Sequence, residues 1–403
     1  MSGPLDGVLV VDLSRVLAGP FCTMLLADLG ARVVKVEAPE GGDVTRAWGP
    51  PWDPATGLSA YYLSVNRNKE SIVLDLAAEA GREAVRTLAR RADVVVENFP
   101  PGGLEKFGLS LAAMRSENPR LVTASITGYG RAGPDASAPG FDLLAQAGSG
   151  LMAITGTPDG PATKVGVAIS DLLAGAFAAT GIAAALFGRE ASGRGAHVEI
   201  DLFRSSLAAL VNVGQASLLT GEEAKRHGNA HPQIVPYRTF AASDGDFVIA
   251  AGTDPQFSRL AAVVGRPEWG QDPRYRTNPA RVENRRELEG ALESILRGAP
   301  RETWLARCRA AGVPAGPVRG PLEALRSEGA RATGAVLSAG GLSFLATPLA
   351  VEGHTPRLDF PPALDADGDR LRREFGLPAA EDGRRKTEDG RKRRRDEGHR
   401  RPK

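Results

Sequence analysis

A single carboxylate stands in the most apolar stretch of the sequence. In the run TKVGVAISDLLAGAFAATGIAAALFG, Asp171 is the only charged residue between Lys164 and Arg189, and it marks the start of a predicted helix. The first turn of a helix offers unpaired N–H groups and a partial positive charge, which favour a carboxylate there. Asp171 is therefore either a helix cap or a nucleophile for an activated carbonyl group. Small neighbours leave room for a substrate: Gly166, Ser170, Ala174 and Gly175.

The turn DLSRVLAGP follows a predicted buried strand at 7–13. Ligands of doubly wound sheets bind beyond the carboxyl ends of the strands, so this turn is a candidate binding segment. It contains Gly19 but not the G-x-G-x-x-G pattern, which disfavours a nicotinamide or flavin cofactor. Arg15 is either a contact to a phosphate or adenine group, or a surface residue.

Further loops contain residue types that suit an anionic ligand, although solvated charge and plain turns are the alternatives. Arg46 and Lys69 are candidate phosphate contacts. In ENFPPGGLEKFG, the glycines permit a close backbone approach and Lys106 adds a cation, while Tyr129 follows the strand of SITGYG. His227 and His231 are four residues apart, but Gly228 and Pro232 oppose the helix that a metal site would need.

The elements that position these loops alternate between strand and helix. We expect strands near 31–39, 71–76, 93–99, 120–128 and 197–202, and helices near 21–30, 78–92, 141–152, 171–188 and 203–221. This alternation predicts a parallel sheet covered by helices. A hairpin near 238–253 and helices near 255–265, 281–297 and 301–312 predict a smaller α+β region.

The composition is that of an ordinary globular protein, with 42% apolar and 24% charged residues. The net charge of +2 comes from the tail 381–403, and the rest of the chain has 39 basic and 42 acidic residues. We therefore expect a disordered basic tail and no nucleic-acid partner. The 163–188 run reads as a buried helix rather than a membrane span. Two distant cysteines and the lack of a secretory signal favour the cytoplasm.

Taken in order, several stretches resemble the family III coenzyme A transferases from about residue 4 to 375. They are VVDLSRVLAGPF, DLGARVVKVEAP, YYLSVNRNKESI, VVVENFPPGGLEKFGL, SITGYG, AISDLLAG and GNAHPQIVPY. Within this family, the motifs most resemble those of the succinate–hydroxymethylglutarate and other dicarboxylate CoA-transferases. The resemblance implies an α/β fold with a large Rossmann-like CoA-binding domain (1–224), a small α+β domain (225–325) and a return segment (326–380). It also implies an interlocked homodimer.

The resemblance further implies that Asp171 is the nucleophile, forming first an anhydride with the donor acyl group and then a thioester with CoA. Acyl-CoA is then a substrate, and no permanently bound cofactor or metal is expected. The positions that match the family's CoA-binding segments are Arg15, Val16, Leu17, Ala18, Asn98, Phe99, Gly102, Gly103, Lys106, Phe107 and Tyr129, with Arg46 and Lys69 as candidate phosphate contacts.

This sequence departs from the formyl-CoA transferase branch of the family at Leu17, Ala38, Ala77, Thr127 and Lys106. These changes argue against formate or oxalate as the substrate, and we expect succinyl-CoA and a dicarboxylate instead. The alternative on the same fold is an α-methylacyl-CoA racemase. That reaction needs a histidine in a G-H-D motif, but the chain reads Gly140-Phe141-Asp142 here, and phenylalanine cannot take a proton.

Overall fold

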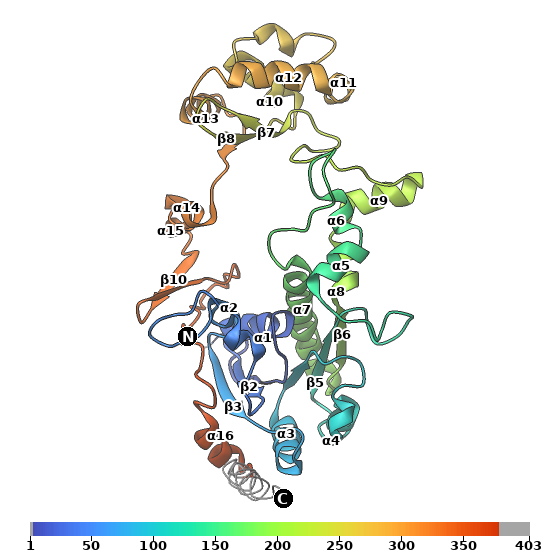
Figure 1. The fold of residues 1–403 in the computed structure, drawn as a ribbon, viewed down its shortest axis with the longest axis vertical. Coiled ribbons are helices and arrows are strands. Elements are labelled where there is room, and N and C mark those ends of the chain that lie inside the picture. Colours follow the sequence, from blue (N-terminus) through green and yellow to red (C-terminus); the bar gives the residue numbers. More distant parts are fainter. Residues whose placement is uncertain (1–2, 379–403) are drawn as a thin grey trace, which may run out of the picture. The chain divides into compact units, whose positions relative to one another are not determined.

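The computed structural model describes residues 3–378, and the predicted tail at 381–403 lies outside them. Six parallel strands form one sheet in the order β3-β2-β1-β4-β5-β6 (Figure 1). They are β1 (Leu9–Asp12), β2 (Arg32–Glu37), β3 (Lys69–Val73), β4 (Val94–Glu97), β5 (Val122–Thr127) and β6 (His197–Asp201). The predicted α/β class with a parallel sheet is confirmed.

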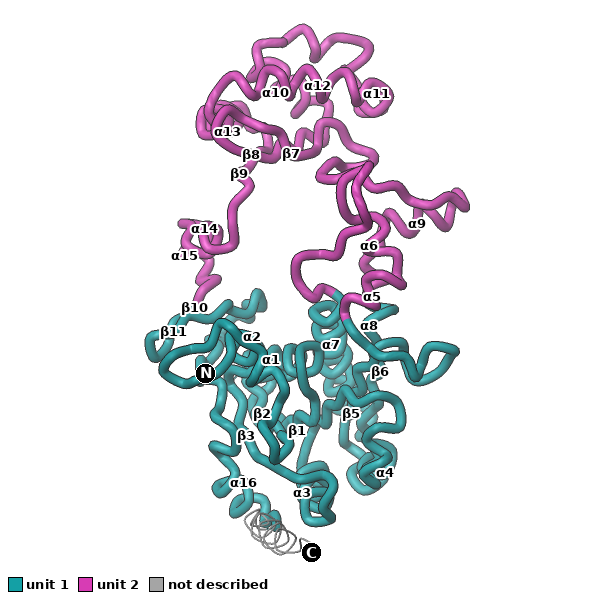
Figure 2. The backbone as a smooth tube through the Cα atoms, viewed as in Figure 1, with its two compact units in different colours: residues 1–141, 170–205, 337–403 teal, residues 142–169, 206–336 magenta. Residues whose placement is uncertain are grey.

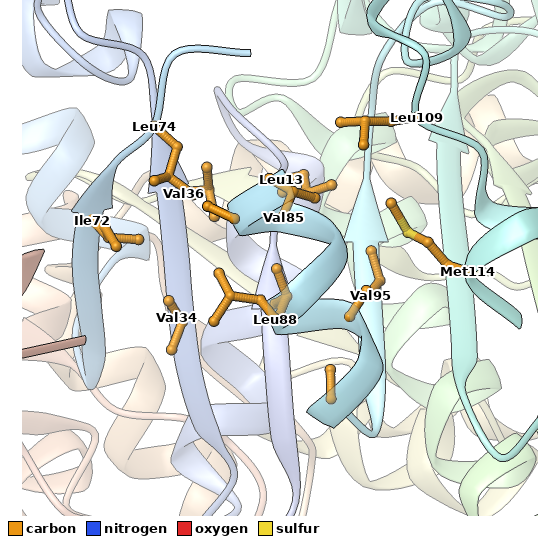
Figure 3. Close-up of a cluster of buried hydrophobic side chains, with 14 of the residues drawn as sticks. Leu13, Val34, Val36, Ile72, Leu74, Val85, Leu88, Val95, Leu109 and Met114 are labelled. Carbon is orange, nitrogen blue, oxygen red and sulfur yellow. The ribbon is translucent and has the colours of Figure 1, made fainter. Parts of the chain in front are cut away.

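Helices cover both faces of this sheet. They are α1 (Ala18–Asp28), α3 (Glu79–Arg91), α4 (Leu111–Glu117), α7 (Ile169–Ser192) and α16 (Gly368–Phe375). Helices α3, α4 and α16 share one apolar core with the strands. Figure 3 shows Val85 and Leu88 of α3 among the strand side chains Leu13, Val34, Val36, Ile72, Leu74 and Val95. Helix α1 contacts β1, β2 and β4, and its buried residues do not belong to that core.

The strand order reverses direction between β1 and β4. From β1 the chain runs outward through β2 and β3, then crosses back to β4 on the other side of β1. The loops after β1 and β4 therefore leave the sheet side by side and diverge. Such a switch point is where open α/β sheets bind their ligands, because the diverging loops leave a crevice between them.

Helix α7 is the only helix within residues 3–378 that is long and apolar enough to cross a membrane. Its Gly175 lies against α1 and its Gly181 lies against Val198 of β6. Only 33% of its most apolar window is buried, so one face packs on the sheet domain and much of the rest is exposed. The expectation of a buried helix therefore holds for one face.

A second compact unit has its own antiparallel sheet, in the order β7-β8-β9, and its own apolar core (Figure 2). Its strands are β7 (Tyr237–Ala241), β8 (Asp246–Ala250) and β9 (Ala315–Pro317). Its main helices are α10 (Asp254–Val263), α11 (Asn278–Glu283), α12 (Arg285–Leu296) and α13 (Arg301–Ala310). This is the small α+β region that the hairpin and the later helices predicted.

The two units divide the chain differently from the predicted domains. Among the described residues, unit 1 comprises 3–141, 170–205 and 337–378, and unit 2 comprises 142–169 and 206–336 (Figure 2). The segments 142–169 and 206–224, predicted in the large domain, thus belong to unit 2. The sheet ends at β6, which pairs with β5. The helical periodicity on either side of β6 does not indicate this pairing, so the sequence did not predict the boundary between the units.

Three predicted helices are interrupted, the first of them at Gly150, whose φ of 86° divides the run 141–152 into two short helices. The run 203–221 forms α8 (Leu202–Ala208) and α9 (Val211–Thr220), with Val211 at a φ of 42°. The run 281–297 forms α11 and α12, which meet at Asn284. The remaining elements are short: η1 (Val44–Ala47), α2 (Ala60–Val65), η2 (Glu105–Phe107), α5 (Asp142–Gly148), α6 (Leu151–Ile154), η3 (Pro267–Gly270), α14 (Pro321–Leu325), α15 (Glu328–Ala332), β10 (Val336–Ala339) and β11 (Leu342–Leu345).

Candidate active site

The turn between β1 and α1 has its backbone tied to both neighbouring strands. The ammonium of Lys35, on β2, donates to the carbonyl of Ser14 at 2.9 Å. Asn98, directly after β4, accepts from the N–H of Arg15 at 3.0 Å and donates to the carbonyl of Arg15 at 2.7 Å. These bonds fix the turn at the switch point, and they bring together two of the predicted binding residues, Arg15 and Asn98.

The next residue of the turn, Val16, adopts a left-handed conformation with a φ of 72°. Such a backbone is unfavourable for a β-branched residue and costs about 1–3 kcal/mol. The N–H of Val16 donates to the two carboxylate oxygens of Asp43 at 3.3 and 3.2 Å. Asp43 in turn forms a buried ion pair with Lys35 at 3.0 Å. A buried charge pair therefore supports the strained residue.

Asp43 is ionised in this arrangement. Burial alone would raise the pKa of its carboxyl group, but the ammonium of Lys35 and the hydrogen bonds from Thr45 outweigh burial. The pKa of Asp43 is therefore lowered below its ordinary value. The N–H of Thr45 donates to the carboxylate at 3.0 Å and the Thr45 hydroxyl donates at 2.8 Å.

Asp171 lies in the first turn of α7 and is half-buried. One helical turn further on, Gly175 packs against α1 so closely that a Cβ there would lie 2.6 Å from the carbonyl oxygen of Ala18. Residues four apart share one face of a helix, so Asp171 lies on the same face of α7 as Gly175, one turn nearer the beginning of the helix. Helices α7 and α1, which carry the predicted residues Asp171 and Ala18, therefore touch at Gly175 and Ala18.

The start of α1 has no cap from its own N-cap side chain, because Leu17 is apolar and forms no such bond. The first N–H groups of a helix have no acceptor within the helix. Gly19 is required at this tight start, since a Cβ there would lie 2.3 Å from the side chain of Ser14. Backbone N–H groups of this kind stabilise an oxyanion when they are held in place.

A pocket of about 220 Å³ opens beyond the carboxyl ends of β1, β2 and β3. It is lined by Leu13, Ser14, Arg15, Lys35, Val36, Glu37, Ala38, Pro39, Gly42, Asp43, Leu74, Asp75, Leu76, Ala77, Phe99 and Phe107. The guanidinium of Arg15 lies 5.5 Å from the centre of the Phe99 ring. The rings of Phe99 and Phe107 meet edge to face at 6.2 Å. This wall of aromatic rings and one guanidinium suits a flat heterocycle.

The segment after β4 turns tightly beside this pocket. Gly102 has a φ of 75°, and a Cβ on Gly103 would lie 2.7 Å from the carbonyl oxygen of Pro100. Lys106, in η2, is exposed, and its neighbour Phe107 lines the pocket. The predicted residues of this segment therefore come together around one loop.

The structure places the two other candidate cations in buried ion pairs. The ammonium of Lys69 is fully buried and lies 3.1 Å from the carboxylate of Asp12. Burial would raise the pKa of Asp12, but Lys69 and Lys35 outweigh it and lower this pKa to about 2. Arg46 binds both carboxylate oxygens of Glu37, at 2.8 and 2.7 Å.

Tyr129 follows β5, and its ring lies 5.7 Å from that of Phe203 at the start of α8. It does not line the pocket beyond β1–β3. Apart from Asp171, the sequence-based set therefore falls into four groups. They are the Arg15–Ala18 turn with Asn98 and Phe99, the loop with Gly102, Gly103, Lys106 and Phe107, the paired cations Arg46 and Lys69, and Tyr129 beside Phe203.

Sequence reasoning missed Lys35 and Asp43. Each carried a signal, since Lys35 interrupts the apolar strand ARVVKVE and Asp43 follows two glycines in EGGDVTR. A lone lysine in a buried strand requires a partner. No local pattern indicated that the partner would be Asp43 or that the pair would reach the Ser14–Val16 turn.

The chain belongs to CoA-transferase family III, whose model matches residues 5–368. It is 42% identical over 382 residues to the acetyl-CoA:oxalate CoA-transferase of Acetobacter aceti, covering 94% of this chain and 97% of that protein. It is 44% identical over 319 residues to the succinate–glutarate CoA-transferase of Agrobacterium fabrum, covering 78% and 80%. The resemblance inferred from the motifs is therefore confirmed, and the chain is a CoA-transferase.

The fold agrees with this assignment. The crystal structure of a CaiB/BaiF family protein from Brucella suis is 42% identical and superposes with a TM-score of 0.85, over 93% of this chain and 100% of that one. A crystal structure of Rv3272 from Mycobacterium tuberculosis is 30% identical, with a TM-score of 0.83 over 92% and 99%.

Replacing Lys69 by methionine tests whether this cation is structural. The change leaves the buried carboxylate of Asp12 without its nearest cation, so we expect a loss of about 3–5 kcal/mol in the free energy of unfolding, measured in urea. The matched change Lys106→Met removes an exposed charge and is expected to alter stability by less than about 0.5 kcal/mol. A stable Lys69→Met protein with a tenfold higher KM for acyl-CoA would instead assign Lys69 to the substrate.

Proposed function

We propose that this enzyme moves coenzyme A from succinyl-CoA to a dicarboxylic acid, with the carboxylate of Asp171 as the acyl carrier. The observation that supports this proposal is the packing of Gly175, one turn after Asp171 on α7, against the carbonyl of Ala18 at the start of α1. We infer from it that the carboxylate of Asp171 lies beside the first N–H groups of α1. A carboxylate that attacks a thioester needs such donors, because negative charge develops on the carbonyl oxygen.

In the first half of the reaction, Asp171 attacks the thioester carbonyl of the donor. The bond to sulfur breaks, and the products are an aspartyl–succinyl anhydride and the CoA thiolate. The thiolate then attacks the aspartyl carbonyl, which releases succinate and leaves CoA bound to Asp171 as a thioester. Each step replaces one acyl bond by another, so no redox change is needed.

In the second half, the acceptor carboxylate attacks the aspartyl thioester and displaces the CoA thiolate. The thiolate then attacks the acceptor's acyl carbonyl in the new anhydride. This attack forms the product thioester and restores the carboxylate of Asp171. Covalent catalysis of this kind divides a difficult exchange into steps with smaller barriers. In each step the same N–H groups would stabilise the negative charge on the carbonyl oxygen under attack.

The pocket beyond β1–β3 is proposed to hold the adenine end of CoA. Its aromatic wall of Phe99 and Phe107 and the adjacent guanidinium of Arg15 support this position. The remaining arm of CoA would then run along the Arg15–Ala18 turn toward Asp171. Arg15 and Lys106 are the exposed cations of this region that we assign to the phosphates.

We also propose that two copies of the chain associate as an interlocked dimer. Large apolar side chains are exposed in both units, including Phe187 on α7 at 85% and Leu218 on α9 at 83%. Exposed apolar surface of this extent is uncommon on a monomer and is typical of a protein interface. Light scattering of the purified protein at micromolar concentration is expected to give twice the mass of the chain, and a monomer mass would contradict the dimer.

Replacing Asp171 by asparagine is expected to lower kcat by at least about a thousandfold, because the side chain can no longer form the anhydride. Hydroxylamine added during turnover should give a hydroxamate on the wild-type peptide that contains Asp171, detected by mass spectrometry. The control Glu190→Gln removes an exposed carboxylate from the other end of α7 and should leave kcat unchanged. Full activity of Asp171→Asn would overturn the mechanism.

A matrix of donors and acceptors tests the substrate class. Succinyl-CoA and acetyl-CoA are supplied as donors against succinate, glutarate, oxalate and acetate, and each product thioester is identified by mass spectrometry. We expect the highest kcat/KM with succinyl-CoA and glutarate, because several relatives are named for succinyl-CoA and dicarboxylates. A preference for acetyl-CoA with oxalate would align the enzyme with the Acetobacter aceti relative instead.

A further inference from the structure

Three consecutive residues of the turn after β1 have backbone groups held by side chains, and two of those side chains form an ion pair. Lys35 holds the carbonyl of Ser14, and Asp43 holds the N–H of Val16. The ammonium and the carboxylate lie 3.0 Å apart, and each side chain is only 1% exposed. The two members of one buried ion pair therefore hydrogen-bond to the backbone on both sides of Arg15.

The residue held by Asp43 is the one with the unfavourable backbone. Val16 has a φ of 72°, which L-residues with a branched Cβ rarely adopt. Strained residues persist only where the surroundings over-determine them, and they are found at functional sites. The two carboxylate oxygens of Asp43 accept the Val16 N–H, so they stabilise this conformation against relaxation to a negative φ.

The conformation of Val16 determines where α1 begins. Leu17 is the N-cap and Ala18 is the first helical residue, and the carbonyl of Ala18 lies against Gly175. A rotation at Val16 would shift the N–H groups of the Leu17–Ala18 segment relative to Asp171. A shift of about 1 Å in a positioning group reduces reaction rates by about a hundredfold.

We infer that Asp43, through its ion pair with Lys35, is a positioning residue for the transfer reaction. It holds Val16 in the left-handed conformation and thereby aligns the start of α1 with the carboxylate of Asp171. This role rests on the proposed function of Asp171, and it assigns Asp43 no contact with the reacting atoms.

The test is a double-mutant cycle between Asp43→Asn and Val16→Gly. Asparagine keeps the shape of the side chain but loses the pairing with Lys35, so kcat is expected to fall at least about tenfold. Glycine adopts a positive φ without strain, so it removes the need for the support. In the Val16→Gly background, Asp43→Asn should therefore lower kcat by less than about threefold.

A purely structural role for Asp43 predicts a different pattern. Asp43→Asn would then lower stability by the same amount in both backgrounds and leave kcat per folded enzyme unchanged. Asp28→Asn is the matched control, because Asp28 forms a similarly buried pair with Arg67 far from the turn. It should lower stability without lowering kcat per folded enzyme. Asp43→Glu keeps the charge for Lys35 but displaces the oxygens, so it should fold, and kcat should fall more than KM rises.

Single-turnover formation of the Asp171 adduct separates this inference from the proposed function. An adduct that forms in the wild type, and about tenfold more slowly in the Asp43 variants, supports both the positioning role and the proposed function. If the adduct forms in Asp43→Glu and Asp43→Asn at the wild-type rate, the positioning role alone is overturned. An equal loss of kcat on Asp43→Asn in both Val16 backgrounds overturns it as well. No adduct in any protein would overturn the acyl-carrier mechanism, whatever the cycle shows.

Discussion

The close approach of two helix beginnings is the constraint on which this site depends. Gly175 of α7 lies against the Ala18 carbonyl of α1, and the hypothetical Cβ distance of 2.6 Å leaves no space for a larger residue. Asp171 lies one turn earlier on the same face of α7. In the proposed arrangement the positive ends of both helices lie beside the carboxylate of Asp171, and the dipole that stabilises a cap would also stabilise charge that develops during acyl transfer.

Charges buried beneath the pocket have a second role, which is to fix the backbone above them. The pairs Lys35–Asp43 and Lys69–Asp12 are almost completely removed from solvent. Buried ion pairs add little net stability, because desolvation offsets their attraction. Their value here is geometric, since Lys35 and Asp43 hold successive peptide groups of the turn. The exposed Arg15 is left free of carboxylate partners among the ion pairs described for residues 3–378.

Local sequence patterns predicted much of the fold. Apolar runs predicted each strand of the parallel sheet to within a few residues, and an isolated aspartate at the head of an apolar helix identified Asp171. These features are local because a buried strand and an amphipathic helix each require their own periodicity. The helix break at Val211 was not predictable, because the surrounding residues all favour helix and only the backbone at φ 42° departs from it.

The sequence by itself determined the elements, the family and the candidate nucleophile, because motifs and periodicity depend on neighbouring residues. The tertiary structure decided which of the candidate cations are paired and which is exposed. Arg46, Lys69 and Lys106 have the same formal charge, yet two of them pair with the carboxylates of Glu37 and Asp12 and one is exposed. Lys69 lies 57 residues from its partner Asp12 in the chain. A contact between residues so far apart in the sequence forms only when the strands pair, so no local pattern predicts it.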